Sequence, residues 1–260
     1  MIKRKYSIPI FAGCSLFLLS SVIQTTAATN TEVISNISVN SDREAYFGDL
    51  HLHTNYSFDA FVFGAQLGPE DGYRFAKGEP ITYLGETVKR RAPLDFLAIS
   101  DHAENIGVFN DIDDPESAIA TSPMGALAKK LKQYQGLIPP SEGAQLTGTI
   151  LKFFHSELPP EFKILPASAW DRMIDYANEY YEPGKFTTFI AYEWTSQSDG
   201  ANLHRNIIFE GDSAPAPFTA ADSSDPQDLW VWLETIRSQG NEALAIPHNG
   251  NASNGLMYDW

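Results

Sequence analysis

The chain has 260 residues, and 43% of them are hydrophobic. This composition suits one large globular domain or two small ones and argues against disorder. The formal charge is −15, from 33 acidic and 18 basic residues, and such a surface repels nucleic acid and anionic lipid. We therefore expect no nucleic-acid partner, although bound cations would reverse the field locally and still admit a phosphorylated substrate.

The first 28 residues are typical of an export signal. Basic residues at 3–5 precede an apolar stretch over residues 8–23, and small residues at 26–28 are typical of a cleavage site. We predict a signal peptide at 1–28, cleaved near Ala28, and a flexible polar lead-in at 29–44; an uncleaved anchor is the alternative. No later stretch is long and apolar enough to span a bilayer, so we expect export and no membrane contact afterwards. The only cysteine, Cys14, lies in this leader, which excludes disulfides and thiolate metal sites from the rest.

Residues 45–260 are predicted to form one α/β domain with a helical insertion at about 103–185. Helical spacing or start signals mark residues 69–76, 124–133, 168–181 and the segment after Asp225-Pro226. Short apolar runs predict five core strands, at residues 46–52, 95–100, 186–194, 204–209 and 243–246. Helices that separate strands favour a largely parallel sheet.

The pair His51 and His53 is the first sign of a metal site. Side chains alternate along a strand, so both imidazoles are expected on one face, with Leu50 and Leu52 facing the core. Asp49 and Asp59 flank the pair, and carboxylates either bind a metal or orient the imidazoles that do.

Further candidate ligands lie at or near the ends of the later predicted strands. In chain order they are His102, Glu193, His204 and His248, with Asp101 beside His102. Carboxyl ends of parallel strands meet at one edge, so five of the six histidines are expected to converge there, and only His155 does not fit. Imidazoles with carboxylates suit Zn, Mn or Fe, and Glu193 is the natural bridge between two ions.

Several of these residues also have an ordinary structural interpretation. His102 is also suited to a helix cap, and His204 to an exposed position hydrogen-bonded to Asn206. Arg205 is a candidate contact for an anionic substrate oxygen, but a surface salt bridge is the more usual role. Asp49 and Asp101 are interpreted as groups that orient histidines. The sequons at Asn36, Asn55 and Asn251 are interpreted as chance matches.

Four segments together resemble the PHP (polymerase and histidinol phosphatase) superfamily. Residues 49–54 with 56–59 resemble its first motif and residues 95–102 its second; Glu193 followed by His204 resembles the third, and Pro247-His248 a reversed His-Pro element. The sequences of residues 47–53 and 73–78 also resemble a secreted branch of this superfamily known only as a domain of unknown function (DUF3604).

The resemblance implies a distorted (β/α)7 barrel that holds two or three divalent metal ions. It assigns His51, His53 and Glu193 to one ion, and Glu193, His204 and His248 to a second. A third ion would be bound by Asp59 and His102. The final Asp-x-His motif of such barrels is absent after His248, so we expect this chain to lack the C-terminal strands of the barrel.

The resulting hypothesis is an exported metal-dependent hydrolase, with a phosphoesterase that uses metal-bound hydroxide favoured. Its partner would be a small, phosphorylated substrate. A metallohydrolase acting on C–N or C–O bonds is the first alternative. A secreted protein that binds metal without catalysis is the second.

Overall fold

The computed structural model describes residues 44–134, 149, 164–248 and 250–258, all within one compact unit, Ser38–Trp260. The predicted signal peptide, nearly all of the lead-in and His155 lie outside these residues. Among the helices of the described ranges, none has the length and apolar character needed to cross a membrane.

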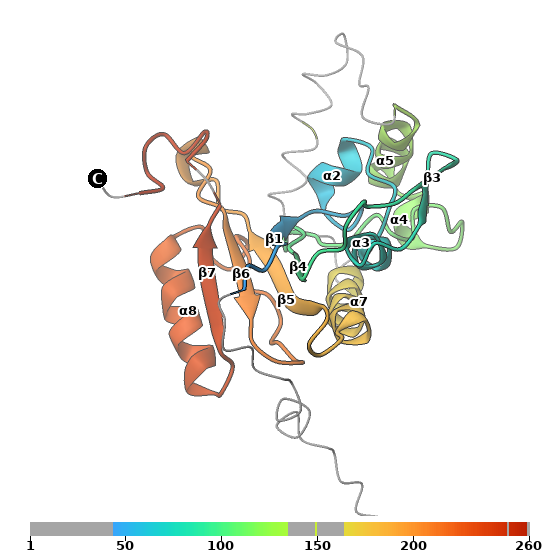
Figure 1. Cartoon of the computed structure of the whole chain (residues 1–260). Helices are drawn as coiled ribbons and strands as arrows, with labels where there is room; N and C mark the ends of the chain where they lie inside the picture. Colours follow the sequence, from blue (N-terminus) through green and yellow to red (C-terminus); the bar gives the residue numbers. More distant parts are fainter. Residues whose placement is uncertain (1–43, 135–148, 150–163, 249, 259–260) are drawn as a thin grey trace, which may run out of the picture. The chain divides into compact units, whose positions relative to one another are not determined.

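Five strands form one sheet in the order β1-β4-β5-β6-β7 (Figure 1). Their bounds are Gly48–Leu52 for β1, Phe96–Ile99 for β4, Thr187–Trp194 for β5, Arg205–Phe209 for β6 and Ala243–Pro247 for β7. All five predicted core strands are confirmed, with small differences at their ends. A separate antiparallel pair, β2 (Ile81–Tyr83) and β3 (Glu86–Val88), was not predicted. Its turn has positive φ at Leu84 and Gly85, and leucine is not a typical residue there.

The predicted (β/α)7 barrel is wrong. Within the described residues the sheet is open and mixed: β1, β4 and β5 are parallel, whereas β6 is antiparallel to both β5 and β7. The reason lies in the connection between β5 and β6, which holds only the short 3₁₀ turn Ser198–Gly200. A parallel neighbour needs a crossover of a dozen or more residues, usually a helix, so a connection this short reverses the strand.

The predicted helices are confirmed where the structure describes them. Pro69 opens α3 and Gly78, with φ of 78°, follows its end; Asp225 caps α8 by accepting a hydrogen bond from the backbone N–H of Gln227 at 2.9 Å. Between β4 and β5 lie α4, α5 and α7, where the helical insertion was predicted. The helix bounds are Phe58–Val62 for α2, Pro69–Ala76 for α3, Ala118–Thr121 for α4, Pro123–Tyr134 for α5, Ile164–Tyr180 for α7 and Pro226–Ser238 for α8.

The two faces of the sheet carry different side chains. Large residues such as Tyr192, Trp194 and Ile207 face a core that also contains residues of α3, α7 and α8. The opposite face has a smaller cluster built on Ala98, Ala191 and Ile208. By strand alternation, Glu193 belongs to this second face, beyond the small residues. Small side chains on this face leave the space around Glu193 to polar groups.

Strand β1 contains an irregularity that changes which side chains point where. Between Asp49 and Leu52 it advances three residues while β4 advances two. One extra residue in a strand interrupts alternation, and Leu50 accordingly joins the small cluster while Leu52 packs against the main core. The prediction that both leucines face one core is therefore wrong.

Candidate metal centre

One edge of the sheet gathers the predicted site residues. His53 follows β1, His102 follows β4, and Glu193 lies near the end of β5. Because β6 runs antiparallel to its neighbours, His204, directly before β6, reaches the same edge as His248, directly after β7. The convergence predicted for a parallel sheet thus arises in a mixed sheet, with one ligand contributed from the start of its strand.

Glu193 is the centre of this arrangement. Its side chain is fully buried, with no exposed area. Five imidazoles contact its carboxylate. The distances are 3.0 Å from His51 Nε2 and 2.8 Å from His53 Nε2 to Oε2, and 3.7 Å from His102 Nδ1, 2.7 Å from His204 Nδ1 and 3.8 Å from His248 Nε2 to Oε1. We call these five histidines and Glu193, together with Asp59, the histidine–carboxylate cluster.

Asp59 extends the cluster towards solvent. Its Oδ1 lies 3.0 Å from Nδ1 of His53, and its Oδ2 lies 3.6 Å from Nε2 of His102. The hydroxyl of Ser57, the residue before α2, donates a hydrogen bond of 2.6 Å to Asp59 Oδ1 and so fixes the carboxylate. Asp59 and His51 are the members with the largest exposed side-chain fractions among the measured pairs, 39% and 36%.

Proton affinities in the metal-free cluster follow from these contacts. Burial alone would lower the pKa of His53, but its hydrogen bonds with Asp59 and Glu193 outweigh burial and raise the pKa to about 10. Burial opposes ionisation of Glu193 and Asp59 as well. The surrounding imidazoles nevertheless hold the pKa of both carboxyl groups far below the usual range. Without metal, His53 is therefore an imidazolium between two carboxylates.

The donor set fits divalent cations. Nε2 of His51 and Nε2 of His53 lie only 3.1 Å apart, and both lie within 3.0 Å of Glu193 Oε2. Ligands of one tetrahedral zinc ion, each about 2.0–2.1 Å from it, would lie about 3.3 Å from each other. Nε2 of His204 is a further buried atom that has no hydrogen-bond partner among the described residues. An unpaired buried ligand atom of this kind is one that a cation satisfies.

Two groups of donor atoms, each group within 4.8 Å, share Glu193. One contains His51 and His248, and the other contains His53 and His102. The resemblance grouped the ligands differently, with His51 beside His53, His204 beside His248, and His102 beside Asp59. In both arrangements Glu193 would be common to two ions.

The two aspartates expected to orient histidines make other contacts. Asp101, fully buried, accepts hydrogen bonds from the backbone N–H and the hydroxyl of Thr54. Burial raises its pKa to about 6. Asp49 is exposed and accepts the backbone N–H of His51 at 3.0 Å. Both carboxylates therefore position the backbone that carries His51 and His53, and neither is hydrogen-bonded to an imidazole ring among the described histidines.

Arg205 lies on the other face of the sheet from Glu193. It pairs with Trp194 across β5 and β6, whereas Glu193 pairs with Asn206. Its guanidinium lies 5.7 Å from the Trp194 ring and 5.3 Å from the Trp230 ring, and burial lowers its pKa. Arg205 is only 5% exposed and has no ion pair among the described residues, so the surface salt bridge is wrong and the predicted substrate contact has no geometric support.

The ordinary structural interpretations of two histidines do not match their positions. His102 follows β4 and forms an isolated bridge with Glu193, and no helix begins there in the described chain. His204 is 8% exposed and contacts Glu193, while the amide of Asn206 donates to the carbonyl of Leu50 at 3.1 Å.

Sequence reasoning missed the residues that support the cluster. The Thr195 hydroxyl contacts Nδ1 of His102 and donates a hydrogen bond of 3.3 Å to the carbonyl of Glu193. Glu104, 5% exposed, accepts the backbone N–H groups of Thr195 at 3.2 Å and of Ala220 at 2.8 Å. In the sequence, these residues are distinguished only by lying one or two positions from Glu193 or His102. That proximity does not show which way their side chains point.

Substituting Thr195→Val is expected to weaken metal binding. Because the Thr195 hydroxyl donates to a carbonyl, it accepts the Nδ1 proton of His102, and Nε2 is then the unprotonated nitrogen that would bind a metal ion. Loss of such an outer partner typically lowers metal affinity about 10–100-fold. Competition titration with a chromophoric chelator would measure this effect. Thr195→Ser should restore affinity, and Thr188→Val, on the same strand but bonded to the carbonyl of Ala177, should leave it unchanged.

These features define a mixed α/β protein with a buried histidine–carboxylate cluster at one edge of its sheet. The family model described as "Protein of unknown function (DUF3604)" matches residues 40–260, and the chain belongs to this family. Searches of curated proteins and of solved structures found no match.

Proposed function

We propose that this protein is a metal-dependent hydrolase of the PHP type, exported by its N-terminal segment and acting on phosphate esters. The observation that carries the proposal is the contact of one fully buried carboxylate, Glu193, with five imidazoles. A buried carboxylate needs compensating positive charge. Five histidines and a carboxylate provide nitrogen and oxygen ligands suited to zinc, manganese or iron.

The residues that would hold two or three ions are His51, His53, Asp59, His102, Glu193, His204 and His248. Divalent cations bound there would activate water, polarise the substrate and neutralise the charge that develops on its oxygens. Asp101 and Thr54 keep the segment after His53 in place, and Thr195 holds His102. These contacts pre-organise the ligand positions.

Exposure favours catalysis over a purely structural metal site. Structural zinc sites are closed by protein ligands, whereas catalytic sites keep a position open for water or substrate. The cluster is buried at Glu193 but open at His51 and Asp59, whose side chains are more than a third exposed. A substrate would approach from this side. Because the protein is otherwise acidic, the bound cations would be the groups that attract a phosphorylated substrate.

Reconstitution of the full chain tests the proposed function. Protein stripped by chelation and then loaded with Zn²⁺, Mn²⁺ or Fe²⁺ would be assayed with a phosphomonoester, a phosphodiester, an amide and a lactone. We expect phosphoester hydrolysis that falls at least about 100-fold on stripping and returns on reloading, in proportion to the ions bound. Preferential amide or lactone cleavage would favour the C–N or C–O alternative. Full activity in the stripped protein would exclude the mechanism.

A further inference from the structure

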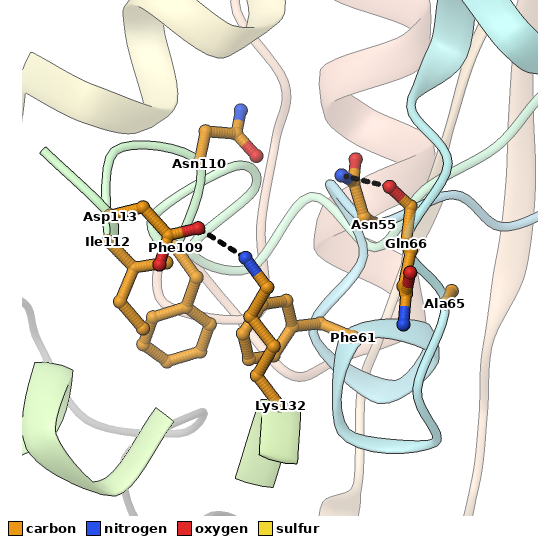
Figure 2. Close-up of a pocket in the computed structure, with 9 residues that line it drawn as sticks. All are labelled: Asn55, Phe61, Ala65, Gln66, Phe109, Asn110, Ile112, Asp113 and Lys132. Atoms are coloured by element: carbon orange, nitrogen blue, oxygen red, sulfur yellow. Dashed lines mark hydrogen bonds and ion pairs between the residues drawn. The ribbon is translucent and has the colours of Figure 1, made fainter. Parts of the chain in front are cut away.

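The segment that follows His53 borders a cavity whose lining includes amide atoms without hydrogen-bond partners among the described residues. Its volume is about 210 Å³, and its lining includes Asn55 and Asn110 (Figure 2). The same two asparagines line a neighbouring cavity of about 250 Å³. Ligand sites for whole drug-sized molecules span about 300–1,000 Å³, so the first cavity suits one ring-sized group.

Three buried amide atoms lack hydrogen-bond partners among the described residues. They are Oδ1 of Asn55 and both Oδ1 and Nδ2 of Asn110. Leaving such a group unsatisfied is unfavourable, so a partner in the cavity is expected. Asn110 offers an acceptor beside a donor, and Asn55 adds a second acceptor.

The local backbone holds these amides in place. Asn55 donates from its backbone to the carbonyl of Leu67 and from Nδ2 to the carbonyl of Gln66. Gly107 has φ of 64°, and a Cβ there would lie 2.7 Å from Nδ2 of Asn110 and 2.4 Å from Cβ of Ala169. Glycine at this position therefore makes room for the Asn110 amide.

The remaining lining is apolar or charge-neutral. Phe61 and Phe109 form an aromatic wall, with ring centroids 4.9 Å apart. Lys132 is paired with Asp113, as Figure 2 shows, so the ammonium is already neutralised. An uncharged ligand group with a flat or apolar face fits this environment better than an ion.

The cavity and the cluster share one segment of chain. Asn55 follows His53 by two residues and precedes Asp59 by four. Asp101 anchors the residue between His53 and Asn55. Part of a substrate bound at the cluster would thus be bordered by the segment that presents Asn55.

We infer that this cavity binds an uncharged group whose edge presents a hydrogen-bond donor beside an acceptor. A nucleobase edge, a sugar diol and a carboxamide share this chemistry, and Asn pairs with adenine in this bidentate way. The further identification of that group as the uncharged part of the substrate rests on the proposed function. Binding in the cavity does not.

Saturation-transfer NMR on the full chain with adenosine, methyl glucoside and N-methylacetamide tests the inference and distinguishes the three sources. At least one probe is expected to bind. Affinity should fall at least about tenfold, or 1.4 kcal/mol, in Asn110→Leu. Asn110→Asp keeps the size and shape of the side chain but replaces the donor with an acceptor and adds a negative charge. It should also weaken binding, and its similar shape guards against a folding defect. Asn178→Ala, whose amide bonds the carbonyl of Asp212, is the matched control and should bind as wild type.

Two outcomes would overturn the inference. Either no probe binds the wild-type chain, which would leave ordered water as the partner of the amides, or both Asn110 variants bind the probes as wild type does. Zinc titration of the same samples separates this result from the proposed function. Probe binding without metal binding would refute the hydrolase and keep the cavity site, and the reverse would refute only the cavity site.

Discussion

Replacement of Glu193 by glutamine is expected to abolish high-affinity metal binding. The substitution preserves shape but removes the negative charge that five imidazoles surround and that both groups of donor atoms share. Losing a shared ligand affects both ions at once, so we expect affinity to fall by more than the roughly 10–100-fold typical of an outer partner. Three measurements should change together: the metal content found by mass spectrometry, the zinc affinity found by titration, and the rate of phosphoester hydrolysis should all fall.

Glu104 provides the matched control for Glu193. It is also a buried carboxylate, lies two residues from His102, and bonds to backbone N–H groups of Thr195 and Ala220. Glu104→Gln should lower the free energy of unfolding but keep the metal stoichiometry of the wild type. Equal metal content in wild type and Glu193→Gln would show that Glu193 is not a ligand, and the proposed centre would fall with it.

The candidate ligands were predictable because chemistry and position coincide in the sequence. Short apolar strands are recognisable, and polar residues that directly follow them must lie at a sheet edge. His102, after the predicted strand at 95–100, and His248, after the predicted strand at 243–246, are examples. Predicting that these residues lie together requires only that the strands are recognised and that their ends meet at one edge. It does not depend on how many strands the sheet contains.

The fold prediction failed where it depended on longer-range geometry. Strand direction at β6 is set by the short connection after Trp194, and the apolar pattern of residues 205–209 is the same in either direction. His204 reaches the same edge as the other candidate ligands because β6 is reversed, and not because the strands are parallel. The extra residue in β1 was equally invisible, since alternation assumes a regular strand.

The supporting contacts depend on packing between distant segments. Asp101 and Thr54 are 47 residues apart, and Thr195 and His102 are 93 residues apart. Serine, threonine and glutamate are common residues, so their types alone did not separate Ser57, Thr195 or Glu104 from exposed ones. The cavity lined by Asn55 and Asn110 also depends on packing between distant segments. Asn55 belongs to a recognisable motif, but Asn110 lies beside it because α2 packs against the segment around Phe109.

Stability with and without metal should respond to pH in opposite directions. In the metal-free chain the pKa of His53 is raised to about 10 from an ordinary 6.5, so its proton stabilises the fold below pH 6.5. That contribution is lost as pH rises towards 10. Metal ions require deprotonated imidazoles, so their affinity rises over the same range. Chelation should therefore cost more stability at pH 9 than at pH 6.

Thermal unfolding with and without EDTA at these two pH values measures the difference. Saturation at 100 times the dissociation constant stabilises by about 2.7 kcal/mol, and 1 kcal/mol shifts the Tm of a domain of 150–250 residues by about 2–4 °C. We expect EDTA to lower Tm by about 5–10 °C at pH 9 and by less than half of that at pH 6. In Glu193→Gln, EDTA should have no effect at either pH. An equal EDTA effect at both pH values in the wild type would mean that metal does not compete with protons for these imidazoles, and the bound ion would have to lie elsewhere in the chain.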